Sequence, residues 1–431
     1  MNHCREFYRL MLQGSHALAR WELEMSTNIL RSRKRQMLLF LMLLPIIIGG
    51  IAIAGNDGEL PSLIGGKSAF MPSFYTNAIF FASIFVGLCA GLITGCIGAG
   101  GGFIIAPALM SVGVKGILAV GTDLFHIFAK AIMGSILHRK LGNISISLAV
   151  TFLVGSLVGA TLGGMLNRYL YDLNPVLSDM FITTVYVFIL GFLSFYAMND
   201  YLRARKGEKD AANKRGPATD DQPVEREAIP PMGKRLQAIN VPPMLTFDEG
   251  VTPGGRKISA LFLVISGLIV GLAAAIMGVG GGFLTFPIFV YGLGVSSMTT
   301  VGTDIFQIVF TAGYSALTQY ALFGFVFYTL AMGMLLGSLI GVQIGSLVTK
   351  VVPGITIRGF FAVAVTAGFI NRAFALPEKL VSMEYITLSA AAGAMLSTIG
   401  NILFFTAITA FTVWVMYTFF ANYNELKKGG H

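Results

Sequence analysis

Two acidic residues stand inside long apolar stretches, and both occupy the same short motif. Of the 21 Asp and Glu residues, only Asp123, in VGTDLFHI, and Asp304, in VGTDIFQI, lie within apolar segments. A charged side chain at the centre of a membrane helix costs roughly 2.5–3.5 kcal/mol on insertion scales, so such residues usually face the bundle interior and have a function. The pair therefore predicts a polar path through apolar surroundings.

The residues that follow these acids indicate what lines the path. Asp123, His126 and Lys130 are spaced i, i+3 and i+7, which places them on one helical face. The matching face of the second motif is made by Asp304, Gln307 and Thr311. Substrate contact, proton relay and a buried ion pair between Asp123 and Lys130 are all open, and so is simple capping of a helix N-terminus by Thr-Asp. His126 is a candidate proton carrier, with a packing role as its alternative.

Two glycine clusters interrupt the apolar stretches in the same way. CIGAGGGFIIAP begins at Cys96, and IMGVGGGFLTFP begins at Ile276. Each interior Gly costs a helix about 1 kcal/mol relative to Ala. Backbone groups freed by such a break are tolerated in a membrane only where protein buries them or where they line a cavity. Freed N–H groups at a helix N-terminus attract anions, whereas close helix packing is the alternative role of these glycines.

We expect the two breaks to face one another and to form an anion site near the membrane midplane, as in transporters built from interrupted helices. The hydroxyls of Thr122 and Thr303, from the two GTD motifs, are candidate donors to the same anion. The candidate cradle consists of Gly98, Gly100, Gly101 and Gly102 on one side and Gly278, Gly280, Gly281 and Gly282 on the other.

The composition identifies the class of protein. The 431 residues are 55% hydrophobic and only 12% charged, whereas soluble domains carry about 25% charged residues. Apolar runs of about 20 residues predict an all-α polytopic membrane protein, and the alternating segments of a β-barrel are not visible. We read the net charge of +9 as cytoplasmic loop charge rather than as a nucleic-acid surface. The three cysteines have no metal-site spacing, so we expect neither a metal site nor a cofactor.

The chain contains an internal repeat. GLCAGLITGCIGAGGGF and GSLVG of the first apolar block return in order as GLIVGLAAAIMGVGGGF and GSLIG in the second. A last apolar segment crosses the membrane once or twice. The predicted organisation is an N-terminal segment 1–36, a first transmembrane helix 37–55, repeat 1 over 77–198, a flexible linker 199–257, repeat 2 over 258–376 and a C-terminal transmembrane helix within 385–420.

Charge placement predicts the orientation. RSRKR before the first helix places the N-terminus in the cytoplasm, and the basic linker belongs on the same side. Between them, repeat 1 must cross an odd number of times. It has three clear helices, so the glycine-broken hairpin enters and leaves by one face. The two repeats are then inverted relative to one another, each with a broken hairpin and three transmembrane helices, and extra helices stand at both ends.

The doubled motif resembles the sulfite exporter TauE/SafE family, also described as the sulfonate uptake permease group. The residues that carry the resemblance are the glycine triplets followed by Pro107 and Pro287, and the small-Thr motifs, in two homologous halves. The resemblance covers both apolar blocks. It implies a multi-pass carrier of the bacterial inner membrane that moves sulfite or organosulfonates and is coupled to protons. The family motif more often continues with Ser, so Asp123 and Asp304 mark a subgroup.

We therefore expect a secondary transporter, not an enzyme, that exports small sulfur-containing anions by alternating access, with Asp123 and Asp304 as proton-coupling groups. Its partners are a small anion and the lipid bilayer, with no nucleic acid, and the sequence carries no signal for an oligomeric state. One alternative is a cation or metal-ion carrier that uses the same two carboxylates. An alternative of a different class is a membrane scaffold that acts through the linker 199–257.

Overall fold

The computed structural model describes residues 60–97, 101–140, 144–213, 231–247, 255–349, 351–352, 354–423 and 426. This part of the chain is built almost entirely from helices and carries one two-stranded sheet. The all-α polytopic prediction is confirmed, since seven of the described helices are long and apolar enough to cross a membrane. They are α3 (Asn77–Ile97), α6 (Ile146–Leu173), α7 (Pro175–Asn213), α9 (Ala260–Met277), α12 (Tyr328–Val348), α13 (Gly354–Ser382) and α14 (Ala390–Ala421).

Both glycine clusters end a helix and start another one. Helix α3 ends at Ile97, and α4 (Gly102–Ser111) begins after the break; α9 ends at Met277, and α10 (Gly282–Pro287) follows and continues as the π-helix η4 (Ile288–Leu293). Gly101 and Gly281, the N-cap residues of α4 and α10, have φ of 66° and 88°. Residues that carry a side chain rarely adopt this left-handed backbone conformation, so the turn at each break requires glycine.

The GTD motifs lie on the helices that follow the breaks. The first motif lies on α5 (Gly116–Lys140), and the second lies on α11 (Ser297–Tyr314). Helix α11 continues as the π-helix η5 (Ser315–Tyr320) and the short 3-10 helix η6 (Ala321–Phe323). Each half of the chain therefore contains the same series: a helix, a break, a short helix, the GTD helix and two long helices.

The first helix of each half packs along the first long helix after the GTD helix of the other half: α3 packs along α12, and α9 packs along α6. Helices α3 and α12 run parallel, because Gly87 and Gly91 lie against Met334 and Ser338, in the same order along the two helices. Helices α6 and α9 run parallel as well, because Gly155 and Gly159 lie against Val264 and Leu268. A Cβ atom at these glycines would collide with the partner backbone, so the glycine stripes set the close approach of these helices.

The GTD helices and the long helices α7 and α13 pair with their own counterparts. Helix α5 packs against α11, and α7 packs against α13. On α7, Asp179 pairs with Lys379 of α13 and Ser194 bonds Thr366, so the order reverses along the partner and the two helices run antiparallel. The same reversal holds for α5 and α11, because Gly121 lies against Tyr320 while Phe128 lies against Gly313.

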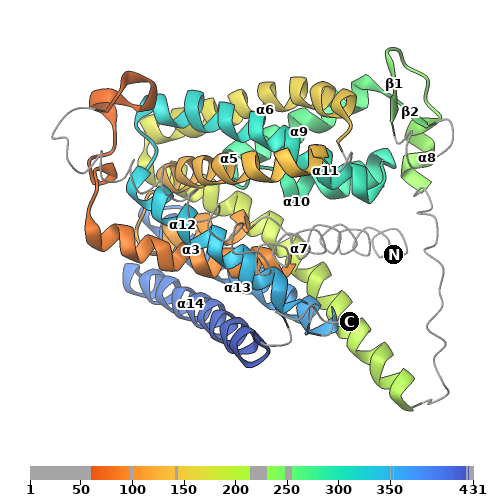
Figure 1. Ribbon diagram of the computed structural model, residues 1–431. Helices are drawn as coiled ribbons and strands as arrows, with labels where there is room; N and C mark the ends of the chain where they lie inside the picture. Colours follow the sequence, from red (N-terminus) through yellow and green to blue (C-terminus); the bar gives the residue numbers. More distant parts are fainter. Residues whose placement is uncertain are drawn as a thin grey trace.

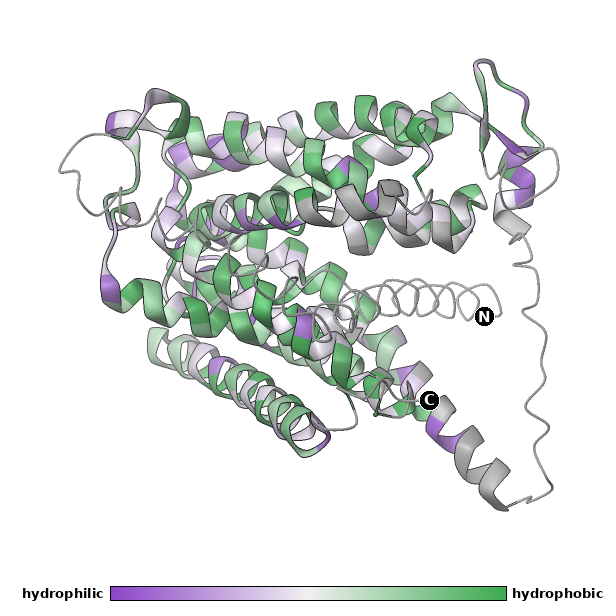
Figure 2. Ribbon diagram, viewed as in Figure 1, coloured by the Kyte–Doolittle hydropathy of each residue, from purple (hydrophilic) through white to green (hydrophobic). Residues whose placement is uncertain are grey.

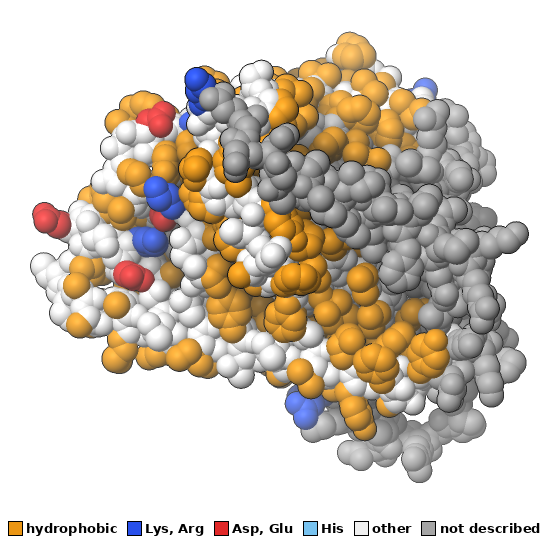
Figure 3. All heavy atoms as spheres, turned by 60° about the vertical axis from the view of Figure 1, so that its left-hand side comes forward, with side chains coloured by type: hydrophobic (Ala, Val, Ile, Leu, Met, Phe, Trp, Pro, Cys, Tyr) orange, Lys and Arg blue, Asp and Glu red, His pale blue; other side chains and the backbone are white. Residues whose placement is uncertain are grey.

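The helices lie side by side in layers, with α6 and α9 at one edge and α13 and α14 at the other (Figure 1). Apolar residues dominate the long helices in Figure 2, and hydrophilic colours concentrate toward helix ends and connections. Figure 3 shows a broad apolar area on the described surface, with most of the visible charged side chains gathered toward one end. This distribution is the one expected of helices that cross a bilayer.

The segment between the two halves is more ordered than the sequence predicts. Helix α7 extends into it as far as Asn213, and it also contains α8 (Pro231–Gln237), β1 (Met244–Phe247) and the start of β2 (Arg256–Ser259). The strands pair antiparallel, and Gln237 and Arg256 donate hydrogen bonds to the carbonyl of Gly294. A flexible linker over all of 199–257 is therefore too broad a prediction, because this part packs against the end of η4.

The remaining segments lie toward the two ends of the chain. The segments 1–36 and 37–55 lie outside the described residues. The chain from Leu60 to Asn77 forms the short 3-10 helices η1 (Ser62–Ile64), η2 (Gly66–Ser68) and η3 (Met71–Ser73). The last apolar segment is one continuous helix, α14, of 32 residues, which is long and apolar enough to cross a membrane.

Candidate functional site

The two breaks touch each other and the GTD helix α5. A Cβ atom at Gly102 would lie 3.1 Å from Cα of Val279, in the second break. Gly278 and Gly280 in turn lie against α5: added Cβ atoms would come within 2.8 Å of Val120 and Ile127. Gly102 thus contacts the second break, whereas Gly101 lies against α3 and Gly281 lies against α9, the helices that precede them. Gly98 and Gly100 lie outside the described residues.

The first turns of α4 and α10 differ in what lies beside them. The N-cap residue of each helix is a glycine, which has no side chain to cap it. At the second break a carboxylate is close: a Cβ atom at Gly282 would lie 3.1 Å from Oδ2 of Asp304. At the first break the nearest atoms to the same position of Gly102 belong to Val279 and Ile127, which are apolar. Negative charge is favourable beside a helix N-terminus, and at α10 Asp304 already supplies it.

The carbonyl end of α9 is capped by side chains from other helices. Tyr186 on α7 donates its hydroxyl to the carbonyl of Met277, the last residue of α9. Tyr320 bonds the carbonyl of Ala275 at 2.6 Å. Asn167 on α6 donates to the carbonyls of Ala275 and Ile276. These bonds satisfy carbonyl groups that the break leaves without helical partners. The sequence analysis missed all three donors, and their signal was a polar group inside an apolar segment.

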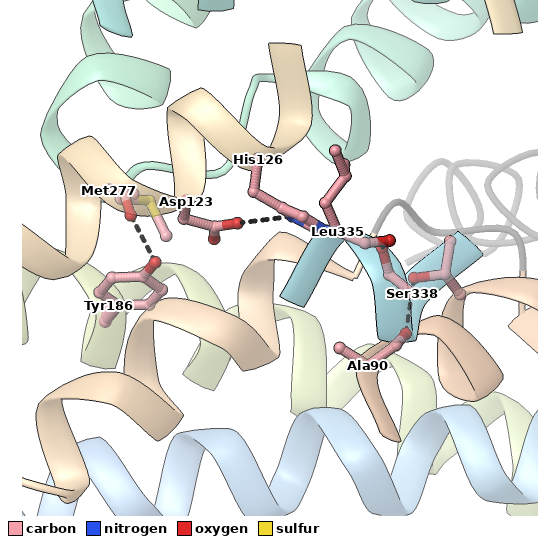
Figure 4. A network of polar contacts seen from close by, with 8 residues as sticks. Ala90, Asp123, His126, Tyr186, Met277, Leu335 and Ser338 are labelled. Atoms are coloured by element: carbon pink, nitrogen blue, oxygen red, sulfur yellow. Dashed lines mark hydrogen bonds and ion pairs between the residues drawn. The ribbon is translucent and has the colours of Figure 1, made fainter. Parts of the chain in front are cut away.

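Asp123 and His126 form a buried pair on α5. The carboxylate points toward the imidazole (Figure 4), and its Oδ1 lies 3.6 Å from Nδ1 of His126. That distance is too long for a hydrogen bond. Asp123 is 0% exposed, and neither of its oxygens has a hydrogen-bond partner among the described residues. The other ring nitrogen, Nε2 of His126, lies 2.8 Å from the hydroxyl of Ser338 on α12.

The corresponding polar groups of the second half form a continuous chain. Gln307 donates to Oδ1 of Asp304 at 2.9 Å, and Thr311 donates to Oε1 of Gln307 at 2.8 Å. The hydroxyls of Thr311 and Ser156 lie 2.8 Å apart. Asp304, unlike Asp123, therefore has a hydrogen-bond donor. All four side chains are buried, so the chain crosses from α11 to α6 away from solvent.

Ser156 and Ser338 are site residues that the sequence analysis did not name. They occupy the same position in GSLVG and GSLIG. Each lies on a helix of one half and contacts the polar face of the GTD helix from the other half. The doubled GSL motif was the available signal, although it indicated only a repeat.

The GTD threonines have backbone partners. The hydroxyl of Thr122 accepts the N–H of Phe327, the N-cap residue of α12, at 2.9 Å. Thr303 accepts the N–H of Ser145, the N-cap residue of α6, at 3.1 Å. Each threonine thus holds the start of a helix from the other half. Both are fully buried, so this contact accounts for their presence without a substrate.

Lys130 is half-buried and lies on the same face of α5 as Asp123 and His126. Seven residues of α-helix rise about 10 Å, and the carboxylate of Asp123 lies 3.6 Å from the imidazole of His126. The charge of Lys130 acts on both of these groups. The polar face of α5 is therefore continuous from Asp123 to Lys130, and an ion pair between these two residues stays a prediction.

Comparisons with known proteins give a family match and several relatives of the sequence. The family model described as Sulfite exporter TauE/SafE matches residues 83–372. The probable membrane transporter protein YjnA of Bacillus subtilis (strain 168) is 27% identical over 267 residues, which are 61% of this chain and 87% of that protein. The sulfite exporter TauE/SafE family protein 6 of Arabidopsis thaliana is 31% identical over 119 residues, 26% of this chain and 28% of that protein.

A further relative is aligned over most of its length. The probable membrane transporter protein YunE of Bacillus subtilis (strain 168) is 21% identical over 280 residues, 63% of this chain and 89% of that protein. No solved structure matches the chain. The family match includes both breaks, both GTD motifs and both GSL motifs, and it ends before α14.

Proposed function

Because the chain belongs to the sulfite exporter TauE/SafE family of membrane transporters, we propose that it exports small sulfur-containing anions, such as sulfite or organosulfonates, by alternating access. The observation that carries this proposal is the contact between the two breaks, at Gly102 and Val279, beside the first turn of α4, whose N-cap residue Gly101 has no side chain. The N–H groups of such a turn carry partial positive charge and suit an oxyanion.

We assign the anion to the first break. At the second break Asp304 lies beside Gly282 and supplies the negative charge that the N-terminus of α10 favours. An anion there would meet the like charge of the carboxylate. Beside Gly102 the neighbours are apolar, so the first turn of α4 offers its N–H groups without a competing carboxylate. Gly101 and Gly102 are thus the substrate-binding glycines, and Gly278 and Gly280 shape the wall opposite.

Proton coupling is assigned to Asp123 and His126. Their facing atoms, Oδ1 and Nδ1, are close, buried and without hydrogen-bond partners among the described residues. A proton taken up there would be shared between two groups that can both titrate, whereas Gln307 in the equivalent place cannot. A proton that moves with the membrane potential supplies about 2.3 kcal/mol per 100 mV, enough to drive export against a gradient of tens-fold.

The antiparallel packing of α5 on α11 and of α7 on α13 supports inverted repeats. A two-fold axis that relates such pairs lies perpendicular to the helices and hence in the membrane plane. Inverted repeats with interrupted helices are typical of secondary transporters that alternate access around a central site. We place the protein in the bacterial inner membrane with its N-terminus in the cytoplasm, on the basis of the basic segments RSRKR and 199–257.

Counterflow in proteoliposomes tests the substrate. The purified full chain is reconstituted in vesicles loaded with unlabelled sulfite, and uptake of radiolabelled sulfite is followed, with phosphate as the negative control. We expect saturable uptake that falls about tenfold or more in Gly102→Ala, because the new Cβ would press on Val279 at 3.1 Å. Gly292→Ala is the matched control, since a Cβ there meets nothing within 4 Å.

The outcome that contradicts the proposal is equally direct. If the folded protein exchanges neither sulfite nor ethanesulfonate, the assignment of sulfur anions is wrong, although membership of the family stands. Divalent cations would be tried next. That alternative has little support in the described residues, which hold no group of three or more His, Cys, Asp or Glu side chains that could bind a metal ion.

A further inference from the structure

A buried arginine lies away from the breaks, on α13. Arg372 is 2% exposed and lies inside a helix that is long and apolar enough to cross the membrane. Removal of a cation from water is costly unless a partner compensates for it. Intramembrane charges are therefore rare and usually mark a pathway or a site. The contacts of Arg372 show which of these explanations fits.

Among the described residues the guanidinium of Arg372 makes no ion pair within 4 Å. The carboxylate of Asp179, on the adjacent helix α7, acts on it only from a greater distance. The oxygens of Asp179 are bonded to other groups: its Oδ1 accepts the N–H of Gly116 at 2.7 Å, and its Oδ2 pairs with Lys379 at 3.3 Å. The groups that bond the guanidinium directly are neutral.

Neutral polar side chains hold the guanidinium in place. Its Nε donates to Oδ1 of Asn371 at 2.7 Å, and its Nη2 donates to the hydroxyl of Ser111 at 2.6 Å. Asn371 in turn donates to Oδ1 of Asn401 on α14 at 2.8 Å. Helices α13 and α14 lie side by side (Figure 1). Three helices, α4, α13 and α14, thus fix the plane of the arginine, while its Nη1 makes no hydrogen bond to the described residues.

A role as the C-terminal cap of α4 does not explain the arginine. The last carbonyls of α4 already have donors: the hydroxyl of Ser111 and the N–H groups of Val112, Gly113 and Val114 bond the carbonyls of Pro107, Ala108, Met110 and Leu109. The helix therefore ends without help from Arg372. The C-terminal end of α4 nevertheless carries partial negative charge, which would repel an anion unless a cation stood beside it.

We propose that Arg372, with Ser111, Asn371 and Asn401, is a second binding station for the transported anion. This inference rests on the proposed function and adds the side chains that supply positive charge to the path. A guanidinium bonds two oxygens of one oxyanion in its plane, which suits sulfite and sulfonate groups. Helix α4 separates the two stations: its ten residues, Gly102 to Ser111, span about 15 Å. The first break and Arg372 thus stand at opposite ends of one short helix.

Ligand-dependent stability of the purified full chain tests the station. A ligand that binds only the folded protein raises the unfolding temperature in proportion to its occupancy. Unfolding is followed in detergent against increasing sodium sulfite and, separately, sodium ethanesulfonate. For Arg372→Gln we expect the half-maximal concentration to rise about tenfold or more, and for Arg372→Lys to rise less, because the charge stays while the planar fork is lost. Arg168→Gln removes an arginine bound to Gln319 in the other half and should leave the titration unchanged.

The anion-free protein gives an independent readout. A structural arginine would lower the unfolding temperature when replaced, but a buried charge without a contacting carboxylate should not. We therefore expect Arg372→Gln to unfold in anion-free buffer at the same temperature as the wild type or above it. A lower temperature together with an unchanged sulfite titration would overturn the proposal and leave Arg372 a structural residue.

The two proposals fail in different ways. If the wild type and Arg372→Gln are stabilised equally by sulfite, the second station is wrong while the proposed function stands. If neither anion stabilises the wild type and counterflow is absent, the proposed substrate class fails and takes the station with it. If Gly102→Ala loses counterflow but keeps an Arg372-dependent stabilisation by sulfite, the two stations are separate and both proposals hold.

Discussion

The two halves of the protein share a helix plan, and they differ in how they treat the same carboxylate. In the second half, Asp304 accepts a hydrogen bond from Gln307 and lies beside the first turn of α10. In the first half, Asp123 is more deeply buried and has no hydrogen-bond partner among the described residues. A duplicated motif therefore does not imply a duplicated role. The carboxylate of the second half is part of a hydrogen-bonded network, whereas the carboxylate of the first half has no hydrogen-bond partner among the described residues.

The difference has an energetic meaning. A buried polar group without a partner costs roughly 1–3 kcal/mol, more when it is charged, whereas a satisfied network costs little. Natural proteins keep such a cost where function requires it. The first half carries this cost at Asp123 and Nδ1 of His126. The second half satisfies each member of the chain from Asp304 to Ser156. We therefore expect replacements in the first half to affect transport and those in the second to affect stability.

The largest contrast is expected between the two carboxylates. Asp123→Asn should lower the rate of uptake driven by a pH gradient about tenfold or more. Sulfite counterflow needs no net proton movement, so its rate should stay within about twofold of the wild-type rate. Asp304→Asn keeps an oxygen for Gln307 and should retain most of the gradient-driven rate. Initial rates with and without an imposed pH gradient measure both. Equal losses of gradient-driven uptake in the two variants would refute the division of labour.

The next largest difference in gradient-driven uptake is expected between replacements of the two serines that the GTD helices contact. Ser338→Ala removes the only partner that Nε2 of His126 has among the described residues. We expect gradient-driven uptake to fall about fivefold to tenfold and its pH profile to shift, since a lost buried partner costs about 1–3 kcal/mol. Ser156→Ala leaves Thr311 bonded to Gln307 and should change uptake less than twofold. A pH profile of Ser338→Ala that overlays the wild type would remove His126 from the proton path.

The residues compared in these predictions differ in how well their positions and contacts could be predicted from the sequence. The breaks, the long helices, the polar faces and the repeat could be predicted, because glycine cost, apolar length and helical spacing are local properties. The partners could not. Ser338 meets His126 across 212 positions of the chain, and Asn167 meets Ala275 across 108. No local pattern encodes which distant helix packs against which face.

Arg372 could have been identified from the sequence, because its signal is local. It stands inside the apolar segment FINRAFAL, just as Asp123 and Asp304 stand inside theirs. The sequence could not show that the arginine makes no contact ion pair with Asp179, because that carboxylate lies on another helix and is bonded to Lys379. Contacts between helices far apart in the sequence decide which charges are paired.

A smaller effect is expected at the capped end of α9, where side chains from α6, α7 and η5 donate hydrogen bonds to the last carbonyls. Asn167→Ala leaves the carbonyl of Ile276 without its donor and weakens support at Ala275. We expect a loss of about 1–3 kcal/mol in unfolding free energy, measured by denaturation in detergent, with counterflow largely kept. Thr94→Ala is the control in the first half, because its hydroxyl bonds Ala90 within its own helix. A larger loss for Thr94→Ala would mean that the first break is the one held by side chains.

The smallest expected difference is between the two threonines, where the halves are alike. Thr122 and Thr303 each accept the N–H group of an N-cap residue in the opposite half, at 2.9 and 3.1 Å, and both are fully buried. Thr122→Val and Thr303→Val keep the shape and remove the acceptor, so each should lose about 1 kcal/mol of unfolding free energy. Equal losses would mean that Thr of the GTD motif was kept in both copies as a link between halves, and that only the Asp diverged. An additional loss of counterflow in Thr122→Val alone would instead extend the difference between the halves to the threonine and add it to the substrate site.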